Sequence, residues 1–182
     1  VALLRERRSI RWFDRKCTRE ELGALLSAVR YSPTAENSGR VEYAVVDERF
    51  DEFMALLASI LELHVSEHPR LEQFVGYVGS GMRERNNPFT WEGRQLIITF
   101  SAIPIDATIS MEQLELMAYC MGLGGFHSRW MLLAAEKSHE RFMSFFPGIA
   151  DGLRPYAVYV VGHPRVSFRR TVHRRERPVH WM

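Results

Sequence analysis

The sequence predicts an α+β fold in which helices pack in layers on a sheet. Several stretches repeat apolar residues at the spacing of a helix that buries one face. Two short runs, residues 96–100 and 157–161, are rich in the apolar and β-branched residues typical of buried strands. Helices and strands mix without strict strand–helix–strand alternation, which disfavours a Rossmann sheet.

The composition is that of a single globular domain, which we expect residues 1–182 to form. Hydrophobic residues make up 46% of the chain and charged residues 25%. The net charge is only +2, so the chain as a whole does not look like a polyelectrolyte binder. The charge is uneven, because residues 163–180 hold six arginines and three histidines against one acid, Glu176.

The first half of the chain predicts three helices and a strand. Thr18 and Glu21 have the spacing of a capping box, which starts a helix that runs to about Tyr31. Its buried face carries Leu22, Leu25, Leu26 and Val29. A polar loop at residues 33–40 leads to a strand at residues 41–47. A helix follows from residue 50 to about residue 65, and Pro69 interrupts the helical pattern. A further helix is predicted over residues 71–82.

The second half contains the most apolar helix, for which Asp106 is the expected N-cap. Apolar residues surround this helix almost completely, so we expect it to be buried against several elements or against a second chain. The sequence GLGG at residues 122–125 ends it, and another helix follows around residues 130–134. Residues 168–182 are basic and irregular.

Residues 5–13 (RERRSIRWF) combine four arginines, a serine and two aromatic rings. Guanidinium groups bind phosphate through paired hydrogen bonds, while the rings anchor the segment in the core. This combination suits a ligand with an anionic end and an aromatic end. The alternative is a solvated basic arm, or one that contacts nucleic acid.

Two further stretches allow a ligand-binding and a plain structural interpretation. The three glycines in residues 122–125 exceed the needs of a helix end and would let the backbone lie flat against a planar ligand. The alternative is an ordinary helix end and turn. The C-terminal arginines are either a solvated tail or groups that close over a phosphate; they are Arg169, Arg170, Arg174, Arg175 and Arg177.

Other chemistry has little support. Residues 64–68 (HVSEH) match the H-x-x-E-H zinc pattern, but no second ligand helix is evident, so we predict no metal site. No nucleophile motif and no Walker A motif occur. Cys17 and Cys120 are far apart, which argues against a disulfide scaffold or an iron–sulfur cluster and favours a cytoplasmic location. We expect no membrane span and no signal peptide.

Four motifs, in order, resemble those of the nitroreductase family of flavin-dependent oxidoreductases. Residues 7–13 (RRSIRWF) are similar to R-[RH]-S-x-[RK]-x-F, and residues 28–38 (AVRYSPTAENS) to A-x-x-A-P-[ST]-x-x-N-x-Q. Residues 106–125 are similar to the family's helix that ends in G-L-G, and residues 160–164 (VVGHP) to x-x-G-Y-P. The ordered set spans nearly the whole chain.

The details look closest to members that often carry an N-terminal ferredoxin domain. Their G-x-P … R-x-x-x-R … W ending fits Gly162, Pro164, Arg170, Arg174 and Trp181. No cluster-binding cysteines occur, so we expect that domain to be absent from this chain, either naturally or by truncation.

The resemblance implies a nitroreductase-like fold, with a central, mostly antiparallel sheet flanked by helices. It also implies FMN bound at the interface of an intertwined homodimer. The implied cofactor-binding residues are Arg7, Arg8, Ser9, Arg11, Pro33, Thr34, Ala35, Asn37, Leu123, Gly124, Gly125, Arg170 and Arg174.

Each group of these residues has an implied place around the cofactor. Arg7 and Arg174 would bind the phosphate, and Arg8 and Ser9 would lie around the phosphate and ribityl chain. Arg11 would reach the flavin N1/O2 edge, where a cation stabilises the negative charge of reduced flavin. The loop at residues 33–37 would approach the flavin of the partner chain, and residues 123–125 would lie over the ring.

The implied activity is ping-pong transfer of hydride or electrons from NAD(P)H or a ferredoxin to a small acceptor such as a nitroaromatic or a quinone. The cofactor carries the chemistry, so we name no catalytic side chain. Gly39 and Arg40 stand where the family usually has Gln-Pro. This difference leaves an alternative function open, that of an FMN-binding protein that handles or senses flavin and is not a reductase. A basic nucleic-acid-binding module is the less favoured alternative.

Overall fold

A central antiparallel sheet organises the computed structural model, which describes residues 2–84 and 86–182. The strand order is β1–β5–β3–β2, and β4 also pairs with β5. The strands are β1 (Phe13–Arg15), β2 (Val41–Val46), β3 (Leu96–Ser101), β4 (Gly124–His127) and β5 (Arg154–Pro164). All pairings among these strands are antiparallel, which confirms the α+β prediction.

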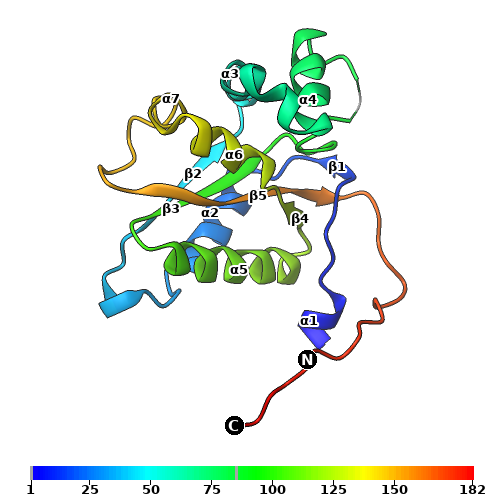
Figure 1. Ribbon diagram of the computed structural model, residues 1–182. Coiled ribbons are helices and arrows are strands. Elements are labelled where there is room, and N and C mark those ends of the chain that lie inside the picture. The colour runs from blue at the N-terminus through cyan, green and yellow to red at the C-terminus, as the bar shows by residue number, and fades with distance from the viewer. Residues whose placement is uncertain (1, 85) are drawn as a thin grey trace.

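Helices cover both faces of the sheet (Figure 1). One face carries α2 (Arg19–Val29) and α5 (Pro104–Cys120). The other carries α3 (Phe50–Leu61), α4 (Pro69–Gly79), α6 (Trp130–Lys137) and α7 (His139–Met143). The short helix α1 (Ala2–Glu6) and the 3-10 turn η1 (Ala35–Asn37) lie outside these layers, whereas the 3-10 turn η2 (Glu62–Glu67) joins α3 to α4.

The core consists of two apolar clusters, one on each face of the sheet. Along β3, Leu96, Ile98 and Phe100 belong to the cluster with α3, α4 and α6, whereas Ile97 belongs to the cluster with α2 and α5. Successive side chains of a strand point to opposite faces, and here both faces are covered. All six residues of β3 are therefore buried, Thr99 and Ser101 included, which agrees with the buried strand predicted at residues 96–100.

The capping box at the start of α2 is confirmed. The Thr18 hydroxyl accepts the Glu21 backbone N–H at 3.1 Å, and the Glu21 carboxylate accepts the Thr18 N–H at 2.7 Å. The helix ends at Val29, two residues before the predicted end. The next predicted helix ends early as well, because α3 stops at Leu61 and residues 62–67 continue as a 3-10 turn.

Three local predictions are wrong. Pro69 begins α4 rather than preceding it, since proline is tolerated in a first turn and the His68 side chain caps the Arg70 N–H. The N-cap of α5 is Ile103; Asp106 lies inside the first turn. Residues 124–127 form β4, where only a turn is predicted, because β5 supplies a pairing partner distant in sequence.

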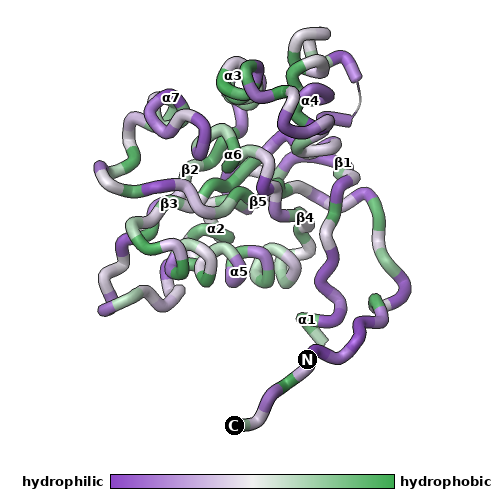
Figure 2. Tube along the Cα trace, in the orientation of Figure 1, coloured by the Kyte–Doolittle hydropathy of each residue, from purple (hydrophilic) through white to green (hydrophobic). Residues whose placement is uncertain are grey.

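The two ends of the chain lie at the same end of the molecule (Figure 1). Both end segments are largely hydrophilic along their length, in contrast to the sheet and the helices packed on it (Figure 2). Of the helices in the described part of the chain, none has the length and apolar character needed to cross a lipid bilayer.

Candidate functional site

The arginine-rich N-terminal segment is fixed to the body of the protein beside β4. The Ile10 backbone N–H donates to the Gly125 carbonyl at 2.8 Å, and Ser9 forms an isolated β-bridge with the same glycine. The Ile10 side chain is buried, whereas Trp12 is partly exposed. An aliphatic residue among the arginines, together with backbone pairing, therefore anchors the segment.

Gly124 and Gly125 are required by the packing of the chain itself. A Cβ on Gly124 would lie 2.7 Å from Ile10 Cγ1, and a Cβ on Gly125 would lie 2.1 Å from the Val160 carbonyl oxygen. Both distances are shorter than any ordinary contact, so a side chain at either position would require its neighbours to shift. The extra glycines thus allow the N-terminal segment and β5 to approach β4, and their presence does not depend on a planar ligand.

A groove of about 650 Å³ opens between the N-terminal segment, the C-terminal half of α5 and the segment after β5. The predicted site residues that line it are Arg7, Arg8, Leu123, Gly124 and Arg170. Ile10, Tyr159 and Phe168 add apolar and aromatic surface. A smaller groove of about 380 Å³ shares Arg7 and Arg8 and includes Arg174.

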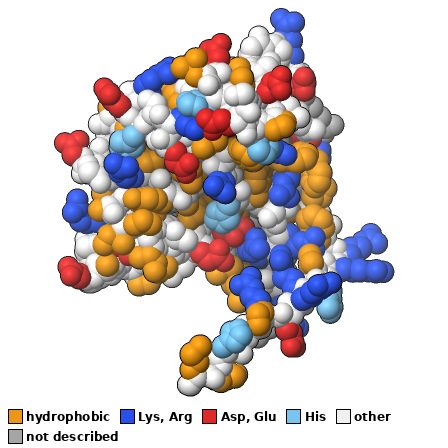
Figure 3. Space-filling model, viewed as in Figure 1, with side chains coloured by type: hydrophobic (Ala, Val, Ile, Leu, Met, Phe, Trp, Pro, Cys, Tyr) orange, Lys and Arg blue, Asp and Glu red, His pale blue; other side chains and the backbone are white. Residues whose placement is uncertain are grey.

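Positive charge gathers around these grooves. Figure 3 shows lysine and arginine side chains concentrated at the end of the molecule that holds α1 and the C-terminal segment. The Arg8 guanidinium lies 4.2 Å from the centre of the Phe168 ring and donates to the Arg170 carbonyl at 3.1 Å. Among the described residues, Arg8, Arg170 and Arg174 form no ion pair, so their charges are available to an anionic ligand.

Arg11 lies apart from the other predicted arginines. Its guanidinium is 5.2 Å from the centre of the Phe126 ring and 5.9 Å from that of Trp91. It is not among the residues that line the groove. The structure thus brings Arg7 and Arg8 to the groove, and holds Arg11 against aromatic rings.

The loop with Pro33, Thr34, Ala35 and Asn37 lies at the opposite end of α5 from the groove (Figure 1). The Asp106 carboxylate, in the first turn of α5, accepts the Ala35 N–H, whereas the groove is lined by residues 115–124. A helix of 17 residues is about 25 Å long at 1.5 Å per residue. Within one chain, the loop and the arginine cluster are therefore separate.

Glu115 is a residue of the groove that the sequence analysis missed. Its side chain is only 3% exposed, and its two oxygens contact Arg7 Nη1 at 2.7 Å and His127 Nε2 at 3.1 Å. Burial alone would raise the pKa of this carboxyl, but the hydrogen bond and charge of His127 and the charge of Arg7 outweigh it and lower the pKa. Glu115 is one of three acids on α5, with Asp106 and Glu112, so the sequence alone did not single it out.

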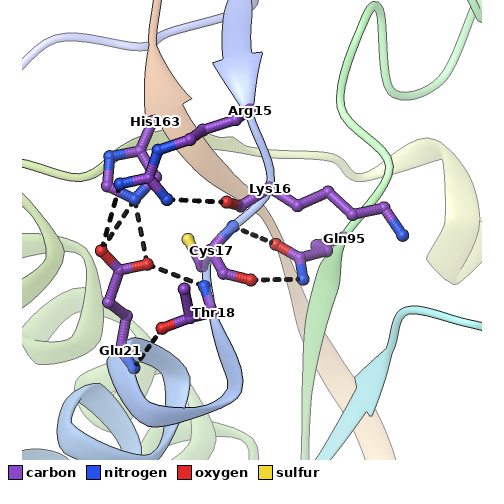
Figure 4. Close-up of polar contacts among 7 residues, drawn as sticks. All are labelled: Arg15, Lys16, Cys17, Thr18, Glu21, Gln95 and His163. Carbon is purple, nitrogen blue, oxygen red and sulfur yellow. Dashed lines mark hydrogen bonds and ion pairs between the residues drawn. The ribbon is translucent and has the colours of Figure 1, made fainter.

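A second polar cluster, around Cys17, has a structural role (Figure 4). The Glu21 carboxylate contacts His163 Nε2 at 2.9 Å and the Thr18 N–H, which joins α2 to the end of β5. The Gln95 side chain pairs with the backbone N–H and carbonyl of Cys17 at 2.6 and 3.0 Å. Burial raises the pKa of the Cys17 thiol to about 12, so the thiol stays protonated.

The H-x-x-E-H histidines also serve local contacts. His64 Nδ1 lies 2.7 Å from the Glu67 carboxylate, which also accepts Lys137 Nζ at 2.7 Å. His68 instead caps α4. The two histidines therefore have separate partners.

Comparison with known proteins extends these observations. The family model described as "Nitroreductase family" matches residues 4–163. A nitroreductase with bound FMN from Desulfitobacterium hafniense DCB-2 superposes with a TM-score of 0.70 at 16% identity, covering 96% of this chain and 92% of that one. None of the curated proteins matches the sequence.

Two other solved structures show the same fold. A nitroreductase with bound FMN from Bacteroides fragilis has a TM-score of 0.70 at 14% identity, over 96% of this chain and 95% of its own. An iodotyrosine deiodinase bound to FMN and 3-iodo-L-tyrosine has a TM-score of 0.64 at 18% identity, over 98% and 96%. These likenesses confirm the predicted nitroreductase-like fold.

Proposed function

The chain belongs to the nitroreductase family, and on this basis we propose that it is an FMN-dependent oxidoreductase. The observation that carries the proposal is the groove in which Arg7, Arg8 and Arg170 face the same space as Leu123 and Phe168. FMN has a dianionic phosphate and a planar apolar ring, which match these two kinds of surface. The groove volume of about 650 Å³ is within the range of cofactor sites.

The arginines are the residues that would hold the phosphate. Arg7 and Arg8 line both grooves, Arg170 lines the larger one and Arg174 the smaller one. Guanidinium groups bind phosphate through short, charge-assisted hydrogen bonds. Ser9, next to them on the segment paired with Gly125, would contact the ribityl chain. Leu123, Gly124 and Gly125 would face the ring.

Bound FMN would supply hydride and electron transfer, and the chain would bind it, orient it and exclude water. For Arg11 to reach the N1/O2 edge of the ring, its side chain would leave the rings of Phe126 and Trp91. The guanidinium lies 5.2 and 5.9 Å from the two ring centres, and cation–π contacts are worth about 0.5–2 kcal/mol, depending on how far they are shielded from water. The proposed role of Arg11 includes a change of side-chain rotamer toward that edge.

A second copy of the chain would complete the site. Pro33, Thr34, Ala35 and Asn37 lie at the far end of α5 from the groove, so a site that uses this loop takes it from a partner. The start of α5 also exposes Ile103 and Ile105, of which Ile105 is 61% exposed. Burying these side chains would favour association. We therefore include a homodimer in the proposal.

The proposed reaction passes reducing equivalents from NAD(P)H or a ferredoxin to a small acceptor, such as a nitroaromatic or a quinone, in two half-reactions. The test is the absorption spectrum of purified, FMN-reconstituted protein before and after anaerobic addition of NADH or NADPH. Flavin absorption that bleaches, and returns with the acceptor, supports the proposal. Protein that stays colourless after FMN is added contradicts it.

A third outcome of the same experiment distinguishes the proposed oxidoreductase from an FMN-binding protein that is not a reductase. Flavin absorption that neither nucleotide nor a reduced ferredoxin bleaches favours an FMN protein that handles or senses flavin. The observation behind this alternative is the 33–40 loop, where Gly39 and Arg40 replace the usual Gln-Pro. Glu36 and Asn37 there also adopt left-handed backbone angles, with φ of 54° and 53°.

A further inference from the structure

The buried carboxylate of Glu115 is the counter-charge of Arg7. Glu115 lies on α5, with its side chain 3% exposed, and one of its oxygens is 2.7 Å from Arg7 Nη1. The other oxygen is 3.1 Å from His127 Nε2, on β4. A buried charge is costly unless its partners are well placed, and the contacts with His127 and Arg7 both favour the ionised form of Glu115.

Little else determines where the Arg7 guanidinium lies. Arg7 directly follows α1, a five-residue helix with no buried residue. The backbone pairs with Gly125 from Ser9 and Ile10 onward, and just before Arg7 the Glu6 carboxylate accepts the Tyr119 hydroxyl at 3.1 Å. Among the described residues, the Arg7 side chain has no hydrogen-bond partner other than Glu115. The contact that orients the Arg7 guanidinium itself is therefore the one with the Glu115 carboxylate.

The contact with Glu115 leaves most of the Arg7 guanidinium free. An arginine has five N–H donors, and only Nη1 is engaged. The Arg7 side chain is 23% exposed and borders both grooves. A guanidinium held on one side by a carboxylate keeps its remaining donors in a fixed orientation, so a ligand need not restrict the side chain on binding.

We propose that Glu115 is a positioning residue that holds Arg7 toward the groove so that Arg7 binds the phosphate of the flavin cofactor. Because this role presupposes the FMN site proposed above, its test compares two flavins that share a ring. FMN carries the phosphate and riboflavin lacks it. Loss of positioning at Arg7 weakens FMN binding and leaves riboflavin binding unchanged, whereas a general loss of structure weakens both.

The experiment measures the dissociation constants of FMN and riboflavin, by quenching of flavin fluorescence, for the flavin-free chain of residues 1–182. Glu115→Gln removes the charge-assisted bond, and we expect FMN to bind about tenfold more weakly while riboflavin is unaffected. Glu115→Asp keeps the charge but draws the carboxylate back, so it should weaken FMN binding in the same direction. It also serves if Glu115→Gln does not fold.

Glu112→Gln is the matched control, because Glu112 is an exposed acid one turn earlier on α5, close to Glu115 and His127. It removes the same charge without a contact to Arg7, so FMN affinity should not change. In an Arg7→Ala background, Glu115→Gln should have no further effect on FMN.

Three results would overturn the inference: equal losses for FMN and riboflavin, unchanged FMN binding, or tighter FMN binding in Glu115→Gln. Tighter binding would mean that Glu115 mainly repels the phosphate. If the unaltered chain binds neither flavin, the proposed function itself fails, which is a distinct result.

Discussion

The Asp106 carboxylate accepts the backbone N–H of Ala35, with its two oxygens 3.1 and 3.2 Å from the nitrogen. This contact joins the loop at residues 33–37 to the first turn of α5, across 71 residues of sequence. Asp106 is only 3% exposed, and a buried carboxylate depends on the hydrogen bonds it accepts. The loop proposed to reach a partner's cofactor is therefore held by one buried side chain.

Removing this carboxylate should destabilise the protein. Asp106→Ala leaves the Ala35 N–H without its acceptor, and we expect the free energy of unfolding to fall by about 1–3 kcal/mol. Urea denaturation followed by circular dichroism measures it. Glu112→Ala, an exposed acid on the same helix, should change the free energy by less than about 0.5 kcal/mol. Equal stabilities of Asp106→Ala and the unaltered chain would contradict the assignment.

Glu21 should make stability depend on pH in the acid range. The hydrogen bond from His163, followed by that from the Thr18 N–H, lowers the pKa of Glu21 from 4.5 to about 2 in the folded chain. A folded pKa below the unfolded value gives stability that is present above pH 4.5 and is lost as the pH falls toward 2.

Glu21→Gln keeps the shape of the capping box and removes the charge. The difference in free energy of unfolding between the unaltered chain and Glu21→Gln should be fully present above about pH 5 and should shrink as the pH falls toward 2. Urea titrations at a series of pH values measure it. Glu20→Gln, at an exposed neighbour in the same turn, should show no such trend. A difference that is independent of pH would rule out the linkage.

Two adjacent glycines should tolerate alanine to different degrees. In Gly125→Ala the new Cβ would lie 2.1 Å from the Val160 carbonyl oxygen, which is backbone and cannot turn away. In Gly124→Ala the contact is with the Ile10 side chain at 2.7 Å, which can shift. We expect losses of about 1–3 kcal/mol or more for Gly125→Ala and smaller losses for Gly124→Ala.

Thermal unfolding measures the stability lost in each of these variants and so ranks them. Gly148→Ala is the control, because a Cβ at this exposed position would meet nothing within 4 Å. A smaller loss for Gly125→Ala than for Gly124→Ala would show that the close contact with β5 is not rigid.

Features set by neighbouring residues could be predicted from the sequence. Thr18 and Glu21 are three residues apart, so their capping box is visible in the letters. The run at residues 96–100 is apolar on both faces, which is enough to predict a buried strand. The role of Asp106 could not be predicted in this way. Its neighbours in the sequence suggested a helix cap, whereas in the structure its carboxylate accepts the N–H of Ala35, 71 residues away.

The same distinction between local and distant contacts applies to the residues of the candidate site. Local density of charge identified Arg7 and Arg8, and the structure places both at the groove. Nothing local distinguishes Arg11, whose position depends on the rings of Phe126 and Trp91. Glu115 was missed because its importance comes from a contact 108 residues away, with Arg7. Pairings between distant segments decide which charged side chains share a space.

Arg8 should control how firmly the C-terminal segment is held. Its guanidinium lies over the Phe168 ring at 4.2 Å and donates to the Arg170 carbonyl at 3.1 Å, in a segment without regular secondary structure. Together these contacts are worth about 1–2 kcal/mol. Arg8→Ala should raise the fraction of open segment, and trypsin should cleave after Arg169, Arg170, Arg174 and Arg175 about tenfold faster.

Mass spectrometry of timed digests identifies the cut sites and gives their rates. Arg5→Ala is the matched control, because it removes the same charge from an exposed residue that forms no hydrogen bond, ion pair or ring contact with the described residues. Phe168→Ala removes the stacking alone and should give an intermediate rate, since the hydrogen bond to Arg170 remains. Equal cleavage rates in Arg8→Ala and Arg5→Ala would show that the segment is held by general electrostatics rather than by the contacts of Arg8.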